Sequence, residues 1–511
     1  MFLLQALLAI AHQSAILLLT LYGLYILVSI GLYLASRPRH DWPESAGVSG
    51  DWPSVTVQLP IYNEPNVADR LVRAVAALDY PSDRLQIQVL DDSRDRTASQ
   101  MAALVARLRE QQGLDISYHH RQVRRGYKAG ALAEALPAAT GDYIAVFDAD
   151  FVPTKDWLRR TVPAILSHPM LAFVQTRWGH LNRSQNLLTA AQGLALDGHF
   201  VIEQQARSAS GLWQNFNGSG GLWRRTAIDA VGGWTADTVT EDLDLSYRAQ
   251  LQGWRGAYLN NIQAPGELPP LVTSFKRQQR RWAKGSMQTL RKLAGRIIIS
   301  PRPLRQRLYA LAHLSGYAIN LPLLVLLALT LPLALLPERL LPLPTLGTLS
   351  LVASLAPLLL YGLAQQQLAG SKGLRRLWAL PVLAVISLGL SPTLGVAVVE
   401  GAVRRGGAFE RTPKQGQHGD RLSLLEKVDW RPMMPEIATL LFALTTLAAV
   451  VAQERWSLLL LPLFYSLGCG FVLVLEWREY RQSRAGAAPS IHAGRLRPLA
   501  EAIPPSDSPL P

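Results

Sequence analysis

Residues 143–150 read YIAVFDAD, an apolar run that ends in two aspartates, Asp148 and Asp150. The β-branched and aromatic residues of this run are typical of a buried strand. Because side chains two apart on an extended chain share a face, both carboxylates can point at one spot. A hard divalent cation such as Mg²⁺ or Mn²⁺ takes oxygen ligands, usually one or two carboxylates plus the phosphates of a substrate. An isolated Asp-x-Asp is more often a solvated turn, so the metal site predicted here depends on the rest of the chain.

The residues before this stretch alternate between two kinds of hydrophobic pattern. Short apolar runs predict strands, and apolar residues at helical spacing predict helices between them. The expected strands lie within 51–62, 85–93, 116–119 and 143–147, and the expected helices are 67–78, 97–108 and 128–136. The resulting order, β-α-β-α-β, favours an open and mostly parallel α/β sheet.

Acidic residues follow the predicted strands. Asp91 and Asp92 end the strand at 85–93, as Asp148 and Asp150 end the one at 143–147. Ligands of such sheets bind beyond the carboxyl ends of the strands, so these four acids can share one site. Lys128 can add positive charge there, or it is a surface lysine at a helix start. This region has neither a G-x-G-x-x-G nor a P-loop pattern, which argues against a dehydrogenase or an NTPase.

Apolar segments flank this region on both sides. Residues 1–36 and much of 310–475 are rich in Leu, Ala and Val, whereas residues 40–300 have a soluble composition. The first apolar stretch, 16–35, is long enough to cross a bilayer, which takes about 20 residues. Arg37 and Arg39 follow it directly without a cleavage pattern, so we expect a retained anchor with its N-terminus outside. Later candidate spans are 314–336, 346–364, 378–399, 434–452 and 456–475.

The formal net charge of +14 does not indicate nucleic acid as a partner. Much of the positive charge lies beside the apolar segments, as expected of cytoplasmic flanks. The single cysteine, Cys469, lies in an apolar span and excludes both a disulfide within the chain and a cysteine metal cluster. We therefore expect a multi-pass protein of the cell membrane, plasma or inner, with a cytosolic domain.

Eight motifs occur in the order in which one known family carries them. They are Pro60-Ile61-Tyr62-Asn63-Glu64, Asp91-Asp92-Ser93, Lys128-Ala129-Gly130-Ala131-Leu132, Phe147-Asp148-Ala149-Asp150-Phe151, Val174-Gln175-Thr176-Arg177-Trp178, Phe216-Asn217-Gly218-Ser219-Gly220, Thr240-Glu241-Asp242 and Gln278-x-x-Arg281-Trp282. Together they make residues 50–420 resemble the family-2 glycosyltransferases of the cellulose synthase superfamily. The resemblance is closest to the cellulose synthase-like branch that includes plant mannan synthases and xyloglucan-backbone synthases, with bacterial relatives. It implies a GT-A-like, Rossmann-like cytosolic domain inserted between transmembrane helices.

The resemblance also implies roles for individual residues. The residues that would bind a nucleotide-sugar donor are Pro60, Tyr62, Glu64, Asp91, Asp92, Lys128 and Asp148. Asp150, with Asp148, would bind the metal, Mg²⁺ or Mn²⁺. Asp242 would be the general base that takes a proton from the acceptor hydroxyl, in a single displacement that inverts the anomeric carbon. Glu241 is a second catalytic candidate by position, although acids in the first turn of a helix, here 241–252, often serve only its dipole.

Two further segments would complete the site. Gln278, Arg281 and Trp282 lie on a basic amphipathic helix, 273–293, that would rest on the membrane surface and meet the acceptor and the diphosphate. Phe409, Thr412 and Lys414 partly match the family's gating loop. If that loop is cytosolic, an even number of crossings must precede it, so 378–399 is expected to lie in the membrane plane or re-enter.

The expected organisation alternates soluble and membrane segments. It comprises an anchor at 1–36, a GT-A domain at 50–300, transmembrane or re-entrant helices at 310–400, a gating-type loop at 401–431, two transmembrane helices at 432–476 and a disordered tail at 485–511. The expected partners are a nucleotide-sugar donor, a glycan or lipid acceptor, membrane lipids and, for export, an accessory subunit.

Three functions fit this pattern. The first is a synthase that adds hexoses from UDP-glucose or GDP-mannose to a β-linked polysaccharide and exports it. The second is transfer of a sugar to a membrane lipid. The third is a membrane scaffold that has lost catalysis, which the complete set of acids argues against.

Overall fold

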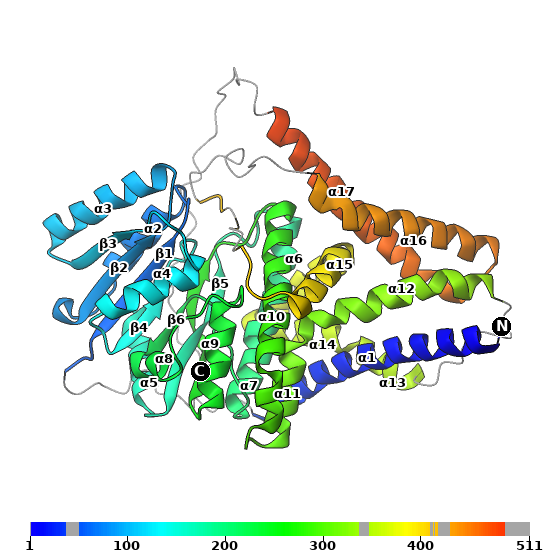
Figure 1. The fold of residues 1–511 in the computed structure, drawn as a ribbon, viewed down its shortest axis with the longest axis horizontal. Coiled ribbons are helices and arrows are strands. Elements are labelled where there is room, and N and C mark those ends of the chain that lie inside the picture. The colour runs from blue at the N-terminus through cyan, green and yellow to red at the C-terminus, as the bar shows by residue number, and fades with distance from the viewer. Residues whose placement is uncertain are drawn as a thin grey trace.

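The computed structural model describes residues 2–36, 51–336, 347–408, 412, 414–416 and 430–485. An α/β domain occupies one end of the molecule and long helices extend from it (Figure 1). The N-terminus lies at the far end of the helical part, away from the sheet (Figure 1). The first helix, α1 (Phe2–Ala35), runs back from that end toward the domain.

The domain is built on a seven-stranded sheet in the order β3-β2-β1-β4-β6-β5-β7. Its strands are β1 (Val55–Ile61), β2 (Leu85–Asp91), β3 (Asp115–His120), β4 (Tyr143–Val146), β5 (Leu171–His180), β6 (Gly221–Arg224) and β7 (Arg255–Gly266). Strand β6 pairs antiparallel with β4 and β5, and the other neighbouring pairs are parallel. The prediction of a mostly parallel α/β sheet is therefore confirmed.

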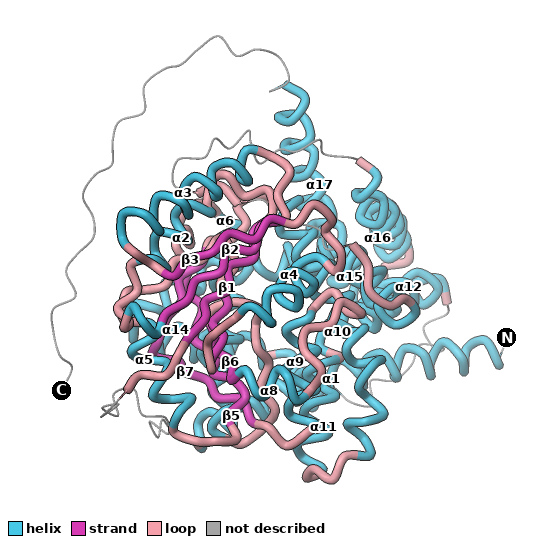
Figure 2. Tube along the Cα trace, turned by 60° about the vertical axis from the view of Figure 1, so that its left-hand side comes forward, coloured by secondary structure: helices cyan, strands magenta, loops and turns pink. Residues whose placement is uncertain are grey.

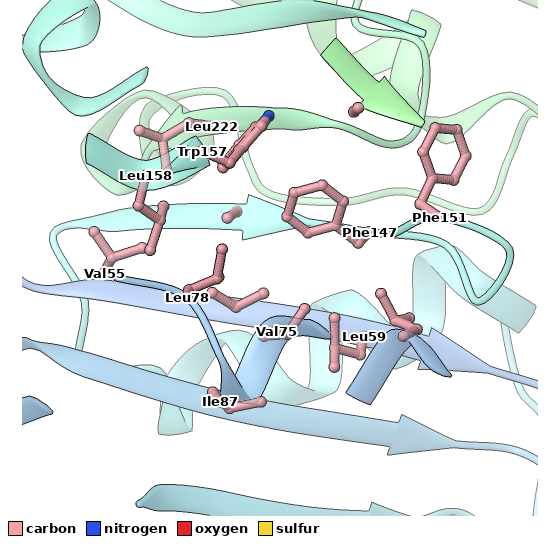
Figure 3. Packing of buried hydrophobic residues seen from close by; sticks show 14 of the residues in the cluster. Val55, Leu59, Val75, Leu78, Ile87, Phe147, Phe151, Trp157, Leu158 and Leu222 are labelled. Atoms are coloured by element: carbon pink, nitrogen blue, oxygen red, sulfur yellow. The ribbon is translucent and has the colours of Figure 1, made fainter. Parts of the chain in front are cut away.

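Helices cover both faces of the sheet (Figure 2). The helices α2 (Ala68–Ala76), α3 (Arg96–Gln112) and α5 (Trp157–Leu166) pack on one face, and α4 (Tyr127–Ala135), α8 (Arg225–Ala230) and α9 (Glu241–Leu251) pack on the other. Strand β4 divides its side chains accordingly, since Ala145 faces the first cluster and Ile144 and Val146 the second. Figure 3 shows the first cluster, where Phe147 packs near Trp157. Each fully buried large apolar side chain adds about 1.5–3 kcal/mol.

The carboxyl ends of β1, β2 and β4 meet at one edge of the sheet, because the three strands are parallel neighbours. Residues that follow these strands therefore come together although they are far apart in sequence. This edge carries Tyr62 after β1, Asp92 after β2 and Asp148 after β4.

Beyond the sheet, the chain is helical. The remaining long helices are α6 (Leu187–Asp197), α10 (Val272–Ile299), α11 (Leu304–Leu314), α12 (Asn320–Leu335), α14 (Ala356–Leu374), α15 (Leu380–Val403), α16 (Met434–Ala452) and α17 (Leu460–Ala485). Among the described residues, five helical segments are long and apolar enough to cross a membrane: Ala6–Ala35, Gly316–Leu335, Thr348–Val403, Arg431–Ala452 and Trp456–Arg484. The third includes most of the stretch expected at 346–364 and all of the one expected at 378–399, and the crossing or re-entry of 378–399 stays a prediction.

Helix α10 joins the two parts of the molecule. It contacts α9 of the domain and α11, α15 and α17 of the helical part. It is longer than the expected helix at 273–293, because its apolar positions continue to Ile297. Residues on α10 are therefore held by the domain on one side and by the apolar helices on the other.

The strands and helices expected before residue 150 are confirmed with small shifts of their ends. Strands β5, β6 and β7 were not predicted, although β5 contains the motif Val174-Gln175-Thr176-Arg177-Trp178. Apart from Ala485, which ends α17, the expected tail at 485–511 lies outside the described residues, as does most of the loop at 401–431.

Candidate active site

One pocket collects most of the predicted site residues. It lies at the carboxyl edge of the sheet, between the domain and α10. The predicted residues that line it are Pro60, Tyr62, Glu64, Asp92, Lys128, Asp148, Asp150, Glu241, Asp242, Gln278, Arg281, Trp282, Thr412 and Lys414. Phe409 lies outside the described residues.

The turn after β1 opens the pocket. Asn63 has a left-handed backbone, with φ at 51°, a conformation that asparagine tolerates better than most residues. Its amide donates to Ser93 Oγ at 2.7 Å, and its Oδ1 accepts from the Arg94 amide at 2.8 Å. These bonds tie the turn after β1 to the one after β2 and so fix the position of Tyr62.

An aromatic and cationic wall forms one end of the pocket. The guanidinium carbon of Arg124 lies 3.4 Å from the ring centroid of Tyr62. Arg121 donates to both oxygens of Asp92 at 2.7 Å, and Arg124 Nε lies 3.7 Å from Asp92 Oδ2. A flat stacking surface beside a carboxylate suits a nucleobase, which has a π face and edge N–H groups.

Lys128 connects the acids in the middle of the pocket. Its Nζ donates to Asp148 Oδ1 at 2.5 Å and to Gly218 O at 2.8 Å, and it lies 3.5 Å from Glu241 Oε1. Burial would lower the pKa of Lys128, but Asp148, Glu241 and Asp242 raise it above its usual value. Burial also raises the pKa of Asp148, although Lys128 opposes this. The lysine therefore remains charged and can face a substrate anion.

Asp242 lies beside this cluster, in the first turn of α9. Burial, followed by the neighbouring charge of Glu241, raises the pKa of Asp242 from 3.8 to about 7. A Cβ placed on Gly218 would come within 2.9 Å of Asp242 Oδ2, and Gly218 has φ at 81°, so a glycine here keeps space at the carboxylate. Asp242 thus combines a pKa close to neutral pH with free space in front of its oxygens, as a general base requires.

The third part of the pocket is aromatic. The ring centroids of Trp178 and Trp282 are 6.4 Å apart, and Trp178 Nε1 donates to Ser219 O at 3.1 Å. Helix α10 brings Trp282 there through a close approach to the domain, since a Cβ on Gly285 would lie 2.4 Å from Thr240 Cγ2. Two tryptophans at a pocket wall offer flat apolar faces to a sugar ring.

A short segment of the chain crosses the pocket at Asp150. Lys414 Nζ lies 2.7 Å from Asp150 Oδ2 and also donates to the carbonyl of Glu267. The Glu267 carboxylate accepts from the amides of Gln415 and Gly416 at 2.8 Å and 3.0 Å. Thr412 and Lys414 are buried. The segment that partly matched a gating loop is thus held against the predicted metal ligand.

The acids of the pocket fit a metal only in part. Within the described ranges, no group of three or more His, Cys, Asp or Glu side chains forms a metal site. Asp148 and Asp150 supply two carboxylates, the number that Mg²⁺ or Mn²⁺ uses when substrate phosphates provide further oxygens. The two residues would therefore hold a metal that arrives with a diphosphate.

Two acids near the pocket, Asp91 and Asp244, are bound by other side chains and do not line it. Asp91 does not line the pocket, because its carboxylate turns into the domain and accepts from Tyr118 Oη and the Ser93 amide, both at 2.8 Å. Asp244 on α9 is fully buried and binds Arg248 and Lys292 at 2.7 Å and 2.8 Å.

The sequence had indicated no role in the site for four polar residues of the pocket: Arg124, His180, Asn217 and Glu267. Arg124 belongs to a basic run just before Lys128, a signal that could have identified it. His180 ends β5 and Glu267 follows β7, so both lie at strand ends that were not predicted. Burial lowers the pKa of His180 and keeps its ring neutral, although Asp197 lies 3.3 Å away.

Comparison with known proteins agrees with this geometry. Residues 53–285 match the family described as "Glycosyltransferase like family 2". Glucomannan 4-beta-mannosyltransferase 2 of Arabidopsis thaliana is 42% identical over 265 residues, which cover 51% of this chain and 49% of that protein. Glucomannan 4-beta-mannosyltransferase 1 of Oryza sativa subsp. japonica is 40% identical over 264 residues, covering 51% and 50%. This chain spans about half the length of these relatives.

A solved structure shares the fold. Mannosyltransferase PcManGT from Pyrobaculum calidifontis, in complex with GDP-Man and Mn²⁺, aligns with a TM-score of 0.55 at 22% identity, over 78% of this chain and 99% of that one. The sheet and its covering helices are thus those of a GT-A-like fold. By the match over residues 53–285 and the arrangement of the motifs in one pocket, this part of the chain is similar to the family 2 glycosyltransferases.

Proposed function

We propose that this protein is an inverting, metal-dependent glycosyltransferase that transfers mannosyl units from GDP-mannose to a growing β-linked polysaccharide. One observation carries the proposal. A single pocket is lined by Lys128, Asp148, Asp242 and Trp282, although these residues come from separate parts of the chain. The pKa of Asp242 is raised to about 7. A donor site, a base and an acceptor surface are the three parts that such a transfer requires.

The donor would lie along the edge of the sheet. Its base stacks at Tyr62 and Arg124 and its diphosphate lies near Lys128. Asp148 and Asp150 would hold a divalent cation, which when bound neutralises charge on the departing diphosphate. Lys128 contributes a fixed positive charge at the same place, in a pocket where the surroundings weaken screening by water.

Asp242 would take the proton from the acceptor hydroxyl as this oxygen attacks the anomeric carbon. A hydroxyl is a poor nucleophile, and a carboxylate with a pKa near the working pH accepts its proton efficiently. The attack comes from the face opposite the leaving diphosphate, so an α-linked donor gives a β-linkage. The diphosphate departs with both electrons of the broken C–O bond.

The acceptor end would lie on Trp282 and Trp178. Stacking on these rings orients the terminal sugar without fixing the length of the chain behind it, which suits repeated addition. Helix α10 also contacts the apolar helices α15 and α17, so a growing glycan would begin next to the segments able to cross a membrane. This arrangement supports coupled export.

The choice of donor is supported by names of relatives. The plant relatives are named as glucomannan 4-beta-mannosyltransferases, and the archaeal structure holds GDP-Man with Mn²⁺. Both favour GDP-mannose over UDP-glucose. The relatives cover about half of this chain, so the proposal for the whole protein needs a direct test.

The test measures nucleoside diphosphate release by the purified full chain with GDP-mannose, GDP-glucose, UDP-glucose and UDP-N-acetylglucosamine, each with Mn²⁺ or Mg²⁺. We expect release with GDP-mannose and a product in which linkage analysis finds β-linked mannose. Asp242→Asn serves as the matched inactive control. Release with a UDP-sugar alone would refute the donor, and a product of one sugar on a lipid would refute polymer synthesis.

A further inference from the structure

Helix α10 carries a lysine that is buried among carboxylates of the helical part. Lys276 Nζ donates to Glu436 Oε2 on α16 at 2.6 Å and to Glu476 Oε1 on α17 at 3.1 Å. It also donates to Pro432 O, just before α16, at 2.7 Å. The side chain of Lys276 is 5% exposed, and those of the two glutamates are 0% and 2% exposed. Removing one partner would leave a buried charge unpaired, so these bonds hold the lysine in one position.

Another carboxylate of α17 caps the start of the same helix. Glu479 accepts from the Val272 amide at 2.7 Å, from the Thr273 amide at 3.1 Å and from Thr273 Oγ1 at 2.8 Å. The first amides of a helix have no partner within it, so this cap supplies the acceptors that they need. Thr393 Oγ1 of α15 donates to Glu436 Oε1 at 2.6 Å and so fixes the carboxylate that binds the lysine. The start of α10 is therefore bound to α16 and α17 by side chains far apart in sequence.

A neighbouring ion pair on the same face of α10 is weaker. Arg280, one turn after Lys276, binds Glu400 of α15 at 2.8 Å. The Arg280 side chain is 37% exposed and that of Glu400 is 24% exposed, so water screens this pair. The buried bonds of Lys276 therefore provide the stronger restraint on this face of the helix.

The other face of α10 lines the active-site pocket through Gln278, Arg281 and Trp282. At 3.6 residues per turn, these side chains leave the helix on the side away from Lys276. A helix with its side chains is about 10–12 Å across, so a rotation of about 10° about its axis moves a side-chain tip by about 1 Å. The bonds of Lys276 fix this rotation less than two turns before Trp282. They therefore determine where the tryptophan ring lies in the pocket.

We propose that Lys276 is a positioning residue for sugar transfer. Its bonds to Glu436 and Glu476, together with the cap by Glu479, hold α10 so that Trp282 faces the acceptor. The inference rests on the proposed function, because it requires that Trp282 binds the acceptor sugar. It adds that α16 and α17 set the acceptor side of the site, whereas the sheet sets the donor side. A change at the lysine should therefore affect turnover and spare donor binding.

The experiment measures nucleoside diphosphate release by the purified full chain for the parent, Lys276→Met and Glu436→Gln, with whichever donor the parent uses. Both variants should lower kcat by about tenfold to hundredfold, the loss expected from a misplacement of about 1 Å. The donor KM should stay within about threefold of the parent value, because the base site at Tyr62 and Arg124 does not involve α10. Trp282→Ala should show the same division between kcat and KM.

Three further variants separate positioning from loss of the fold. The double variant Lys276→Met with Glu436→Gln removes the same ion pair as either single change, so kcat should fall no further than in the worse single variant. Glu476→Gln should cost less than Glu436→Gln, since Glu476 Oε2 accepts no hydrogen bond within the described residues. Arg296→Met removes an exposed basic residue at the other end of α10 and should turn over as the parent does. If Lys276→Met does not fold, Glu436→Gln decides, because it keeps the lysine and the shape of its partner.

Amide hydrogen exchange gives a second measurement that does not need activity. Lys276→Met and Glu479→Ala should speed exchange over residues 272–282 and leave β1 and β4 unchanged, whereas a general loss of structure would speed both. The inference is overturned if kcat or the exchange of α10 matches the parent, if the donor KM rises in step with the loss of kcat, or if the two single losses multiply in the double variant. A parent that releases no diphosphate from any donor contradicts the proposed function instead, and the exchange comparison still decides whether these contacts hold α10.

Discussion

Lowering the pH from 8 to 6 should slow sugar transfer about tenfold, because Asp242 can accept a proton only in its ionised form. Burial and the neighbouring Glu241 raise the pKa of Asp242 to about 7. With this pKa, the ionised fraction falls from about nine tenths at pH 8 to about one tenth at pH 6. A carboxylate at its ordinary pKa would remain ionised over the whole interval, and the rate would not change.

The assay follows nucleoside diphosphate release with GDP-mannose at low donor concentration, so that kcat/KM reports the free enzyme. The diphosphate of the donor is esterified at both ends and does not titrate in this window. Glu241→Gln removes a negative neighbour and should therefore lower the pKa of Asp242, moving the acid limb of the profile toward lower pH. Asp242→Asn should lower turnover by about 10²–10⁴-fold and remove the limb.

Three results would refute this reasoning. A parent profile that is flat between pH 6 and 8 would mean that no group with a pKa near 7 controls the reaction. A limb that persists unchanged in Asp242→Asn would assign the titration to another residue. A shift of the limb toward higher pH in Glu241→Gln would contradict the cause given for the raised pKa.

Three other changes test the rest of the site. Asp150→Ala should abolish metal-dependent donor binding, since it removes a proposed metal ligand; calorimetry with and without Mn²⁺ measures this, and an unchanged metal dependence would contradict the assignment. Lys414→Met should tighten Mn²⁺ binding severalfold in the absence of donor, because the ammonium 2.7 Å from Asp150 competes for the same carboxylate; equal affinity by metal titration would exclude that competition. Gly285→Ala should lower stability by about 1–3 kcal/mol and reduce turnover, because the added carbon meets Thr240. Gly295→Ala, on the same helix with no atom within 4 Å of the added carbon, should instead be neutral or stabilising by up to about 1 kcal/mol; similar melting temperatures for the two variants would refute the close approach.

The elements before residue 150 could be predicted because they depend on local periodicity. The run at 143–147 is apolar and β-branched, and it forms β4 at Tyr143–Val146. Strands β5 to β7 were not predicted, because β6 is short and antiparallel and β7 is interrupted by a register shift against β5. Their pairing is set by distant partners, which the pattern within each strand does not reveal.

The sequence also predicted part of the candidate site. Motif residues at the strand ends, such as Asp92 and Asp148, do line the pocket, because parallel strands bring their carboxyl ends to one edge. The sequence did not distinguish Asp92 from Asp91. Adjacent side chains on a strand point to opposite faces. The contact of Asp91 with Tyr118 on β3 turns Asp91 into the domain, and Asp92 is the one that lines the pocket.

By itself, the sequence determined the strands before residue 150, the apolar helices, and that acids follow those strands, because each of these depends on neighbours along the chain. Only the tertiary structure decided that Lys414 meets Asp150, that Arg124 covers Tyr62, and that α10 lies between the pocket and the apolar helices. The physical reason is that these contacts join residues far apart in sequence. Their formation depends on how whole elements pack, and the periodicity of a single segment carries no information about its partner.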